Sequence, residues 1–395
     1  MTVQETLLAR LEASQAEIIA IRRHLHEHPE VSFKEKETAA SIRDFYLKLG
    51  LTPVPYGEGY GLAVDIDSGH PGPHIALRAD FDALAVQEDN DLPFASQNPG
   101  VMHACGHDGH TAYLLVLARE LNALKAQLKG SIRIIHQPAE EVSPGGAKGM
   151  IEAGVLNDID QVLGLHVMSS MPTGSIGYHA GETQTGRSNF TLTFTGKGGH
   201  ASMPQLANDA IVAGSYFVTA LQTVVSRRID PFDTASVTIG SFDGVGSFNA
   251  IKQSVTLKGD VRVMKEATRK TVRAAIEQII GGVEAMFGVK ADLDYDDNYP
   301  VLVNDAALTA STVAALKAAA LPEVNDIFDC GPQDPSEDFA YYAQEKPSLF
   351  FYIGCAVPDG QAHPHHSPDF LLNEDSLIIA AKAAGVAALV ALDIK

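Results

Sequence analysis

The stretch Met102-His103-Ala104-Cys105-Gly106-His107-Asp108-Gly109-His110-Thr111-Ala112 places one thiol, three imidazoles and one carboxylate within eleven residues. Apolar residues recur at helical spacing directly after it, so we expect a helix over 113–124. Cys105 and His107 lie two residues apart in a glycine-loosened turn, so that both side chains can point to one place. Thiolate and imidazole bind zinc and its first-row neighbours well. The alternative is a loop that leads into a helix, with a buried structural cysteine and solvated histidines.

Apolar runs that resemble strands surround this stretch and alternate with helical segments. We expect strands over 61–66, 74–77, 131–136, 161–165 and 348–353, and helices over 4–28, 37–49, 113–124, 146–153 and 378–392. Short, continuous apolar runs are typical of strands buried on both faces. Strands that alternate with helices indicate an open sheet covered by helices on both sides. The sequence therefore predicts an α/β fold with a mixed, largely parallel sheet.

Four of these strands are followed by polar residues of the kinds that bind metals. These residues are Asp80 and Asp82, Glu140 and Glu141, His166, and the histidine-containing loop 363–366. Ligands of open α/β sheets bind beyond the carboxyl ends of the strands. We therefore expect all four groups to lie along one rim of the sheet together with Cys105 and His107. This placement favours a metal site over a structural cysteine.

The adjacent residues Glu140 and Glu141 could serve two different roles. Adjacent acidic residues are usually solvated surface, but this pair follows an apolar strand and a proline. Neighbouring side chains of an extended chain point in opposite directions, so one carboxylate can bind a metal while the other faces a water molecule. Metal-assisted hydrolysis needs both a water of lowered pKa and a base that takes its proton. The spacing leaves open which glutamate has which role.

The remaining polar groups at the rim have more than one interpretation. An isolated histidine such as His166 is more often a core residue, but its place after a strand favours a metal ligand. The loop near the C-terminus carries His363, His365 and His366. At most one or two of these need be ligands. Asp80 could orient a ligating imidazole from behind, whereas Asp82 could as easily cap a turn.

Residues 187–302 differ in pattern from the segments on either side. Their expected order of elements is β-α-β-β-α-β, which matches a ferredoxin-like sandwich. We therefore expect a domain inserted at 187–302 between the two parts of a first domain, 1–186 and 303–395. The glycine run before His200 could cradle an anion or form a strand-to-helix loop. It does not match a phosphate-binding P-loop.

Length, charge and cysteine content limit the classes of protein. A chain of 395 residues exceeds one compact core, so two domains are expected. The net charge of −20, from 29 basic and 49 acidic residues, argues against nucleic acid or an anionic membrane surface as partner. Three scattered cysteines indicate a reducing compartment. We find neither a signal-peptide pattern nor an apolar run of about 18 residues, and we expect a cytoplasmic protein.

Ordered motifs extend over nearly the whole chain. They are Arg22-Arg23-His24-Leu25-His26 with Pro29-Glu30, Arg78-Ala79-Asp80-Phe81-Asp82-Ala83-Leu84, His103-Ala104-Cys105-Gly106-His107-Asp108-Gly109-His110, Gln137-Pro138-Ala139-Glu140-Glu141, Gly164-Leu165-His166, Gly198-Gly199-His200-Ala201-Ser202, Ser336-Glu337-Asp338-Phe339 and His366-Ser367-Pro368. In these motifs the chain resembles the amidohydrolases of the dinuclear metallopeptidase clan: aminoacylases, hippurate hydrolases, indole-acetyl-amino-acid hydrolases and N-acetyl-diaminopimelate deacetylases. Peptidase relatives carry His-x-Asp where this chain has Arg78-Ala79-Asp80, which favours the cysteine-containing amidohydrolase branch.

The resemblance implies a role for individual residues. The implied metal ligands are Cys105, His107, Glu141, His166 and His366. They imply two divalent ions per subunit, of zinc, manganese, cobalt or nickel, with Cys105 between them. Glu140 is implied to be the catalytic base, and the inserted domain to be a lid through which the chain forms a homodimer. His200 is implied to stabilise an oxyanion in the partner subunit's site, and Asn249 and Arg262 to bind the substrate carboxylate.

The resulting hypothesis is hydrolysis of the amide bond of an N-acyl amino acid to a carboxylate and a free amino acid. Three alternatives stay open at this point: a small-peptide carboxypeptidase, an N-carbamoyl amino acid hydrolase, and a metal-dependent binding protein without turnover. Binding alone would not need a base such as Glu140, which argues against the last of these.

Overall fold

The computed structural model describes residues 1–394, which form two compact units. The first unit contains residues 1–183, 303–332 and the described residues from 338 onward. The second contains residues 184–302 together with the short segment 333–337. The second unit thus spans the expected insertion and takes in a further segment that the sequence pattern did not indicate. No helix among the described residues has the length and apolar character that a membrane span requires.

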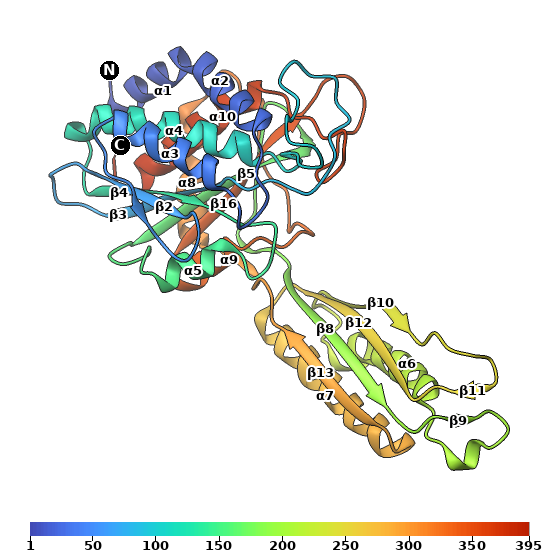
Figure 1. The fold of residues 1–395 in the computed structure, drawn as a ribbon. Helices are drawn as coiled ribbons and strands as arrows, with labels where there is room; N and C mark the ends of the chain where they lie inside the picture. The colour runs from blue at the N-terminus through green and yellow to red at the C-terminus, as the bar shows by residue number, and fades with distance from the viewer. Residues whose placement is uncertain (395) are drawn as a thin grey trace. The chain divides into compact units, whose positions relative to one another are not determined.

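An eight-stranded sheet is the centre of the first unit (Figure 1). Its strands, in spatial order, are β1 (Val54–Pro55), β2 (Leu62–Asp67), β4 (Ser131–Gln137), β3 (His74–Asp80), β5 (Gln161–Pro172), β16 (Ser348–Ala356), β6 (Ser175–Tyr178) and β15 (Asp326–Asp329). The four central strands β4, β3, β5 and β16 run parallel, and antiparallel pairs flank them. This arrangement confirms the predicted α/β fold with a mixed, largely parallel sheet.

Helices cover both faces of this sheet. On one side lie α1 (Val3–Ala13), α2 (Gln15–Glu27), α3 (Lys36–Lys48), α4 (His107–Leu124) and α10 (Asp375–Ala391), and on the other α5 (Gly146–Glu152) and α9 (Ala340–Glu345) (Figure 1). Helix α8 (Ala306–Ala319) packs against α10. The main core lies between the sheet and the first group, where α4 and α10 are buried along almost their whole length. A helix that is apolar on all sides is expected in such a position.

Three elements differ from the prediction in ways that matter for function. The expected helix 4–28 is two helices, because the backbone of Ser14 leaves the helical conformation between α1 and α2. Helix α4 begins at His107 rather than at residue 113, so His107 and His110 are helical. Strand β5 continues to Pro172, which places His166 inside a strand. However, the neighbouring strand β3 pairs with β5 only as far as Gly164. At His166, the edge of β5 that faces β3 is therefore no longer paired with it.

The second unit is a four-stranded antiparallel sheet with two helices packed on one face (Figure 1). Its main elements are β8 (Gly186–Thr195), α6 (Ala210–Arg228), β10 (Ala235–Asp243), β12 (Ser254–Val263), α7 (Glu266–Phe287) and β13 (Lys290–Asp296). The strands lie in the order β10-β12-β8-β13. Alternate residues of β8, among them Phe190, Leu192 and Phe194, pack against the helices. The two short strands β9 (Gly199–His200) and β11 (Ala250–Ile251) pair with each other.

Candidate metal centre

A sharp turn before α4 brings Cys105 and His107 together. Gly106 is the N-cap of the helix and has a φ of 91°, a left-handed conformation that side chains rarely adopt. A β-carbon at this position would lie 2.5 Å from Cγ2 of Val167. Glycine is therefore required both for the turn and for the close approach of strand β5. The first helical residue, His107, is fully buried.

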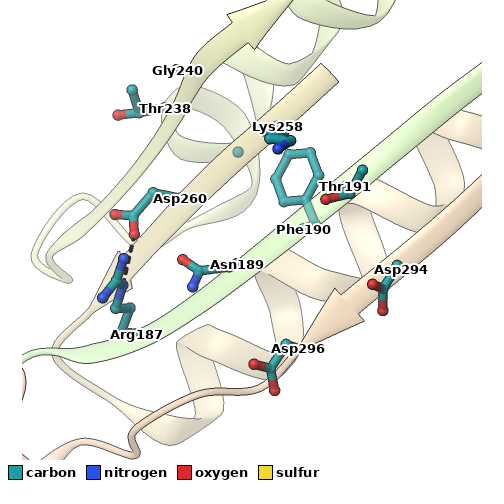
Figure 2. Close-up of a pocket in the computed structure, with 11 residues that line it drawn as sticks. Arg187, Asn189, Phe190, Thr191, Thr238, Gly240, Lys258, Asp260, Asp294 and Asp296 are labelled. Atoms are coloured by element: carbon teal, nitrogen blue, oxygen red, sulfur yellow. Dashed lines mark hydrogen bonds and ion pairs between the residues drawn. The ribbon is translucent and has the colours of Figure 1, made fainter. Parts of the chain in front are cut away.

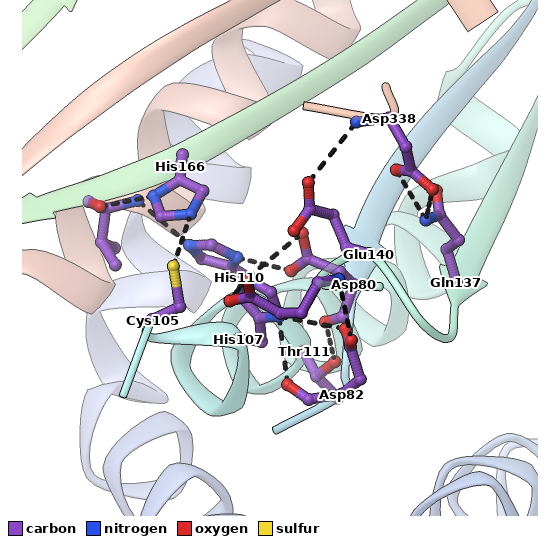
Figure 3. Close-up of polar contacts among 12 residues, drawn as sticks. Asp80, Asp82, Cys105, His107, His110, Thr111, Gln137, Glu140, His166 and Asp338 are labelled. Atoms are coloured by element: carbon purple, nitrogen blue, oxygen red, sulfur yellow. Dashed lines mark hydrogen bonds and ion pairs between the residues drawn. The ribbon is translucent and has the colours of Figure 1, made fainter. Parts of the chain in front are cut away.

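Five side chains from four segments converge beyond the ends of the central strands. Figure 3 shows three of them, Cys105, His107 and His166. The ligand atoms of Cys105, His107 and His166 lie within 4.8 Å of one another, as do those of Cys105, Glu141 and His366. Sγ of Cys105 is 3.5 Å from Nε2 of His166, and Oε1 of Glu141 is 3.3 Å from Nε2 of His366. Cys105 belongs to both groups, so its sulfur lies between them.

The ring nitrogens at this centre are oriented by groups behind them. Nδ1 of His107 lies 3.2 Å from the Asp82 carboxylate, and Nδ1 of His166 donates to the carbonyl of Val167 at 2.6 Å. These contacts occupy Nδ1 of each ring, so Nε2 faces the centre. Nε2 of His107 is buried and makes no hydrogen bond within the described part of the chain. A buried imidazole nitrogen without a hydrogen bond, 3.8 Å from the carboxylates of Asp80 and Glu141, fits a metal ligand.

Asp80 and Asp82 have different partners, which spacing alone did not distinguish. The Asp80 carboxylate lies 2.6 Å from Nδ1 of His110, whose Nε2 accepts the backbone N–H of Val167. Both nitrogens of His110 are therefore in use. It is Asp82 that contacts Nδ1 of His107, and its other oxygen accepts the backbone N–H of Glu141 at 3.1 Å. Asp82 thus positions two of the converging side chains, a role that the sequence pattern suggested for Asp80.

Only one histidine of the loop 363–366 has its side chain at the centre. Nε2 of His365 accepts the backbone N–H of Ser169. His363 contacts Asp359 through Nε2 and the carbonyl of Asp369 through Nδ1. His366 has a φ of 65°, and its backbone N–H donates to the carbonyl of Ala104, one residue before Cys105. That hydrogen bond holds the loop against the turn that carries Cys105 and His107.

The electrostatics of the centre favour a bound cation. Burial on its own would lower the pKa of His107, but the carboxylates of Asp80, Asp82 and Glu141 raise it to about 10. Burial and the carboxylates of Glu141 and Glu140 raise the pKa of the Cys105 thiol. The carboxylates therefore concentrate negative charge around a half-buried group of donors. A divalent cation in this position would compensate that charge and favour the thiolate.

Glu140 lies beside the converging side chains and is held from two sides. One oxygen accepts the backbone N–H of Asp338 at 3.4 Å (Figure 3). The preceding residue, Ala139, has a φ of 55°, and its N–H donates to the buried carboxylate of Glu35 at 2.8 Å. This contact stabilises a backbone conformation that is unfavourable for a residue with a side chain. Sequence reasoning did not identify Glu35, because it lies more than one hundred residues before the turn.

A buried arginine connects the two acidic regions behind the centre. Arg78 donates to Asp80 at 2.7 Å and to Asp338 at 2.8 Å, and its Nε donates to Gln137. Gln137 in turn donates to Asp338 (Figure 3). Burial raises the pKa of Asp338 to about 6, although Arg78 and Gln137 lower it. At the position where peptidase relatives were expected to have a histidine, this chain therefore has a buried cation that binds two carboxylates.

The three other predicted residues, His200, Asn249 and Arg262, belong to the second unit. His200 is exposed, and its Nδ1 is 2.7 Å from the hydroxyl of Ser202. Asn249 accepts a hydrogen bond from Ser247. Arg262 donates to Asp260, whose other oxygen accepts from Arg187 at 3.0 Å.

Arg187 and Asp260 also line a shallow pocket of about 400 Å³ on the open face of the sheet (Figure 2). The pocket is lined by Lys258, Asp294 and Asp296 as well. Charges of both signs thus lie around it, and His200, Asn249 and Arg262 are not among its lining residues.

The chain belongs to peptidase family M20/M25/M40, which matches residues 76–389. It is 37% identical over 375 residues to N-acetyl-L-cysteine deacetylase of Bacillus subtilis (strain 168), covering 95% of this chain and 88% of that protein. It is 38% identical over 301 residues to N-acyl-L-amino acid amidohydrolase of Geobacillus stearothermophilus, covering 76% of this chain and 81% of that protein.

Two solved structures are similar over nearly the full length. A protein of methicillin-resistant Staphylococcus aureus has 54% identity and a TM-score of 0.95, covering 98% of this chain and 100% of that one. A dinuclear metal-binding peptidase of the M20 family from Bacillus subtilis has 32% identity and a TM-score of 0.84, covering 97% of this chain and 100% of that one. These findings confirm the resemblance indicated by the motifs and the assignment to a family of hydrolases.

Proposed function

We propose that this protein is a dinuclear-metal amidohydrolase that cleaves the amide bond of N-acyl amino acids. The observation that carries the proposal is the convergence of thiol, imidazole and carboxylate donors in two groups that share Cys105, with the Glu140 carboxylate beside them. Relatives over most of the chain are named for the removal of acyl groups from amino acids, which supports the substrate class.

The proposed ligands are Cys105, His107, Glu141, His166 and His366. Two groups of donors that share one sulfur fit two ions with a bridging thiolate, and the relative that is described as dinuclear supports this number. Thiolate and imidazole suit zinc, cobalt and nickel, and carboxylate also suits manganese. Bound ions would supply a water of lowered pKa and polarise the scissile carbonyl.

Glu140 is the proposed general base. Its carboxylate would take a proton from the attacking water and return it to the leaving amine nitrogen, as general acid–base catalysis requires. Asp338 and the held backbone at Ala139 would keep this carboxylate at the centre while Glu141 binds metal. Because the two neighbouring side chains have separate supports, the pair can serve two roles at once.

The second unit is proposed to act as a lid and as the surface of a homodimer. Helix α6 exposes Val212 and Tyr216, four residues apart on one face, by 39% and 55% of their surface, and exposed apolar side chains of this kind support association. His200 would stabilise the oxyanion in the partner subunit's site, while Asn249 and Arg262 would bind the substrate carboxylate. Light scattering tests the dimer, and Tyr216→Glu should weaken it. A cytoplasmic location is proposed because the three cysteines are free.

Metal analysis combined with a substrate panel tests the reaction. The panel contains hippurate, N-acetyl amino acids, N-acetyl-diaminopimelate, N-carbamoyl amino acids and dipeptides, each with and without chelator. We expect about two ions per chain and a chelator-sensitive release of amino acid from the acyl substrates. Turnover of dipeptides or carbamoyl substrates alone would favour the peptidase or carbamoyl hydrolase alternatives. Two bound ions without any turnover would favour a binding protein.

Glu140→Gln separates the base from the ligands. The variant should bind both ions and lose nearly all turnover, because an amide cannot take a proton from water. The matched variant Glu141→Gln should lose metal as well as activity. A Glu140→Gln enzyme with near-normal kcat would exclude this residue as the base.

A further inference from the structure

A second group of possible metal ligands lies at the C-terminal end of helix α2, outside the centre described above, with His24 and Glu27 in the last turn and His28 as the C-cap. His24, Glu27 and His28 have ligand atoms within 4.8 Å of one another. Residues three apart are neighbours on a helix surface, so His24 and Glu27 share one face, and the C-cap brings His28 beside them. His24 and His28 are exposed and Glu27 is half-buried, whereas Leu25 and His26 on the opposite face are buried.

The hydrogen bonds of these side chains leave their metal-binding atoms available. Nδ1 of His28 lies 2.9 Å from the carbonyl oxygen of His24. A carbonyl only accepts, so Nδ1 carries the proton and Nε2 keeps its lone pair. Metal-binding histidines usually have this arrangement, with the second nitrogen donating to a carbonyl or carboxylate. Neither the His24 ring nor the Glu27 carboxylate has a hydrogen-bond or ion-pair partner among residues 1–394.

The backbone that carries these ligands is already fixed by the core. The carbonyl of Glu27 accepts the N–H of Gln97, and the side chain of Asn98 donates to the carbonyl of Pro29, the residue after His28. On the inner face of the same turn, Nδ1 of His26 lies 2.8 Å from the carboxylate of Asp108. A cation would therefore have to order only three side chains, which lowers the cost of binding.

We propose that His24, Glu27 and His28 form a separate binding site for one divalent cation of the zinc, nickel, cobalt or copper type. Two imidazoles and one carboxylate, with water in the open positions, are a donor set that these metals prefer over magnesium or calcium. The net charge of −20 attracts cations to the protein. A bound ion would link the side chains of His24, Glu27 and His28. Because it binds only the folded chain, it would stabilise the folded state.

Nickel titration of the enzyme with its catalytic ions already in place tests this site. Equilibrium dialysis and metal analysis are carried out on the wild type, on the double variant His24→Ala/His28→Ala, and on His70→Ala, which removes an exposed imidazole elsewhere. We expect the wild type and His70→Ala to bind about one more ion per chain than the double variant. Amide hydrolysis should be the same in all three proteins.

Glu27→Gln provides a second variant that keeps both histidines. The Glu27→Gln variant should bind nickel more weakly at this site but still bind it. In the wild type, nickel binding should be lost at acidic pH, because imidazole must be unprotonated to bind metal. Circular dichroism establishes that each variant is folded. Equal nickel stoichiometry and affinity in the wild type and the folded double variant would overturn the proposal. The result is independent of the catalytic centre, whose ions and activity are measured separately.

Discussion

Replacing the buried Glu35 with glutamine should flatten the pH dependence of stability between about pH 4.5 and pH 7. Burial, together with the nearby charge of Asp82, raises the pKa of Glu35 from its ordinary value of 4.5 to about 7. The folded state therefore holds this proton more tightly than the unfolded state. The stability that it contributes is present below pH 4.5 and is lost as the pH rises through 7. The difference in pKa corresponds to about 3 kcal/mol.

Glutamine has no proton to lose and keeps an oxygen that can accept the N–H of Ala139. We therefore expect the free energy of unfolding of Glu35→Gln, relative to wild type, to increase by about 3 kcal/mol between pH 4.5 and pH 8. Urea unfolding followed by circular dichroism measures this difference. Chelator must be present, because bound cations would alter the charge that Glu35 experiences. Glu37→Gln, which removes an exposed carboxylate of the same type, is the matched control.

A constant difference between wild type and Glu35→Gln across this pH range would refute the reasoning from burial. Glu35→Ala tests the second role of the side chain. It leaves the N–H of Ala139 without its acceptor, so the turn that carries Glu140 can relax. Misplacement of a catalytic group by about 1 Å can cost about 100-fold, and we expect kcat to fall toward that value in the alanine variant but not in the glutamine variant.

Three further substitutions address the supports of the centre. Asp82→Asn removes the carboxylate behind His107 and should lower metal affinity by about 10–100-fold, measured by competition with a chelator. Gly106→Ala puts a side chain at a φ of 91°, which should cost about 1–3 kcal/mol in unfolding free energy and reduce bound metal. Arg78→Met leaves the buried carboxylate of Asp338 without its cation and should cost about 3–5 kcal/mol in urea unfolding.

Each of these variants has a result that would contradict its prediction. An unchanged metal affinity of Asp82→Asn in the chelator competition would mean that the Asp82 carboxylate does not strengthen metal binding by His107. Full stability in Gly106→Ala would mean that the turn is more adaptable than its close contact indicates. Arg43→Met, at an exposed ion pair, should cost only about 0–1 kcal/mol. A similar cost for Arg78→Met would show that burial adds nothing.

The convergence of the side chains at the centre could be predicted from local patterns in the sequence. Apolar strands followed by Asp80, Glu140 or the histidine loop indicated which residues meet at the rim, because parallel strands of one sheet end on the same side. The family motifs indicated Cys105 and His366 as members of the same group of side chains. For residues 187–302 the expected order of elements was β-α-β-β-α-β, and the second unit contains a four-stranded antiparallel sheet.

The orientation of individual side chains could not be predicted in this way. Asp80 and Asp82 are equivalent by spacing, yet only Asp82 contacts Nδ1 of His107. His365 and His366 are adjacent, yet Ser169 binds the first and leaves the second at the centre. In each case the partner comes from a distant segment, and its approach depends on how strands and helices pack. Hydrophobic periodicity is a local property of the chain, whereas the choice between two similar polar groups depends on which buried partner the fold brings within hydrogen-bonding distance.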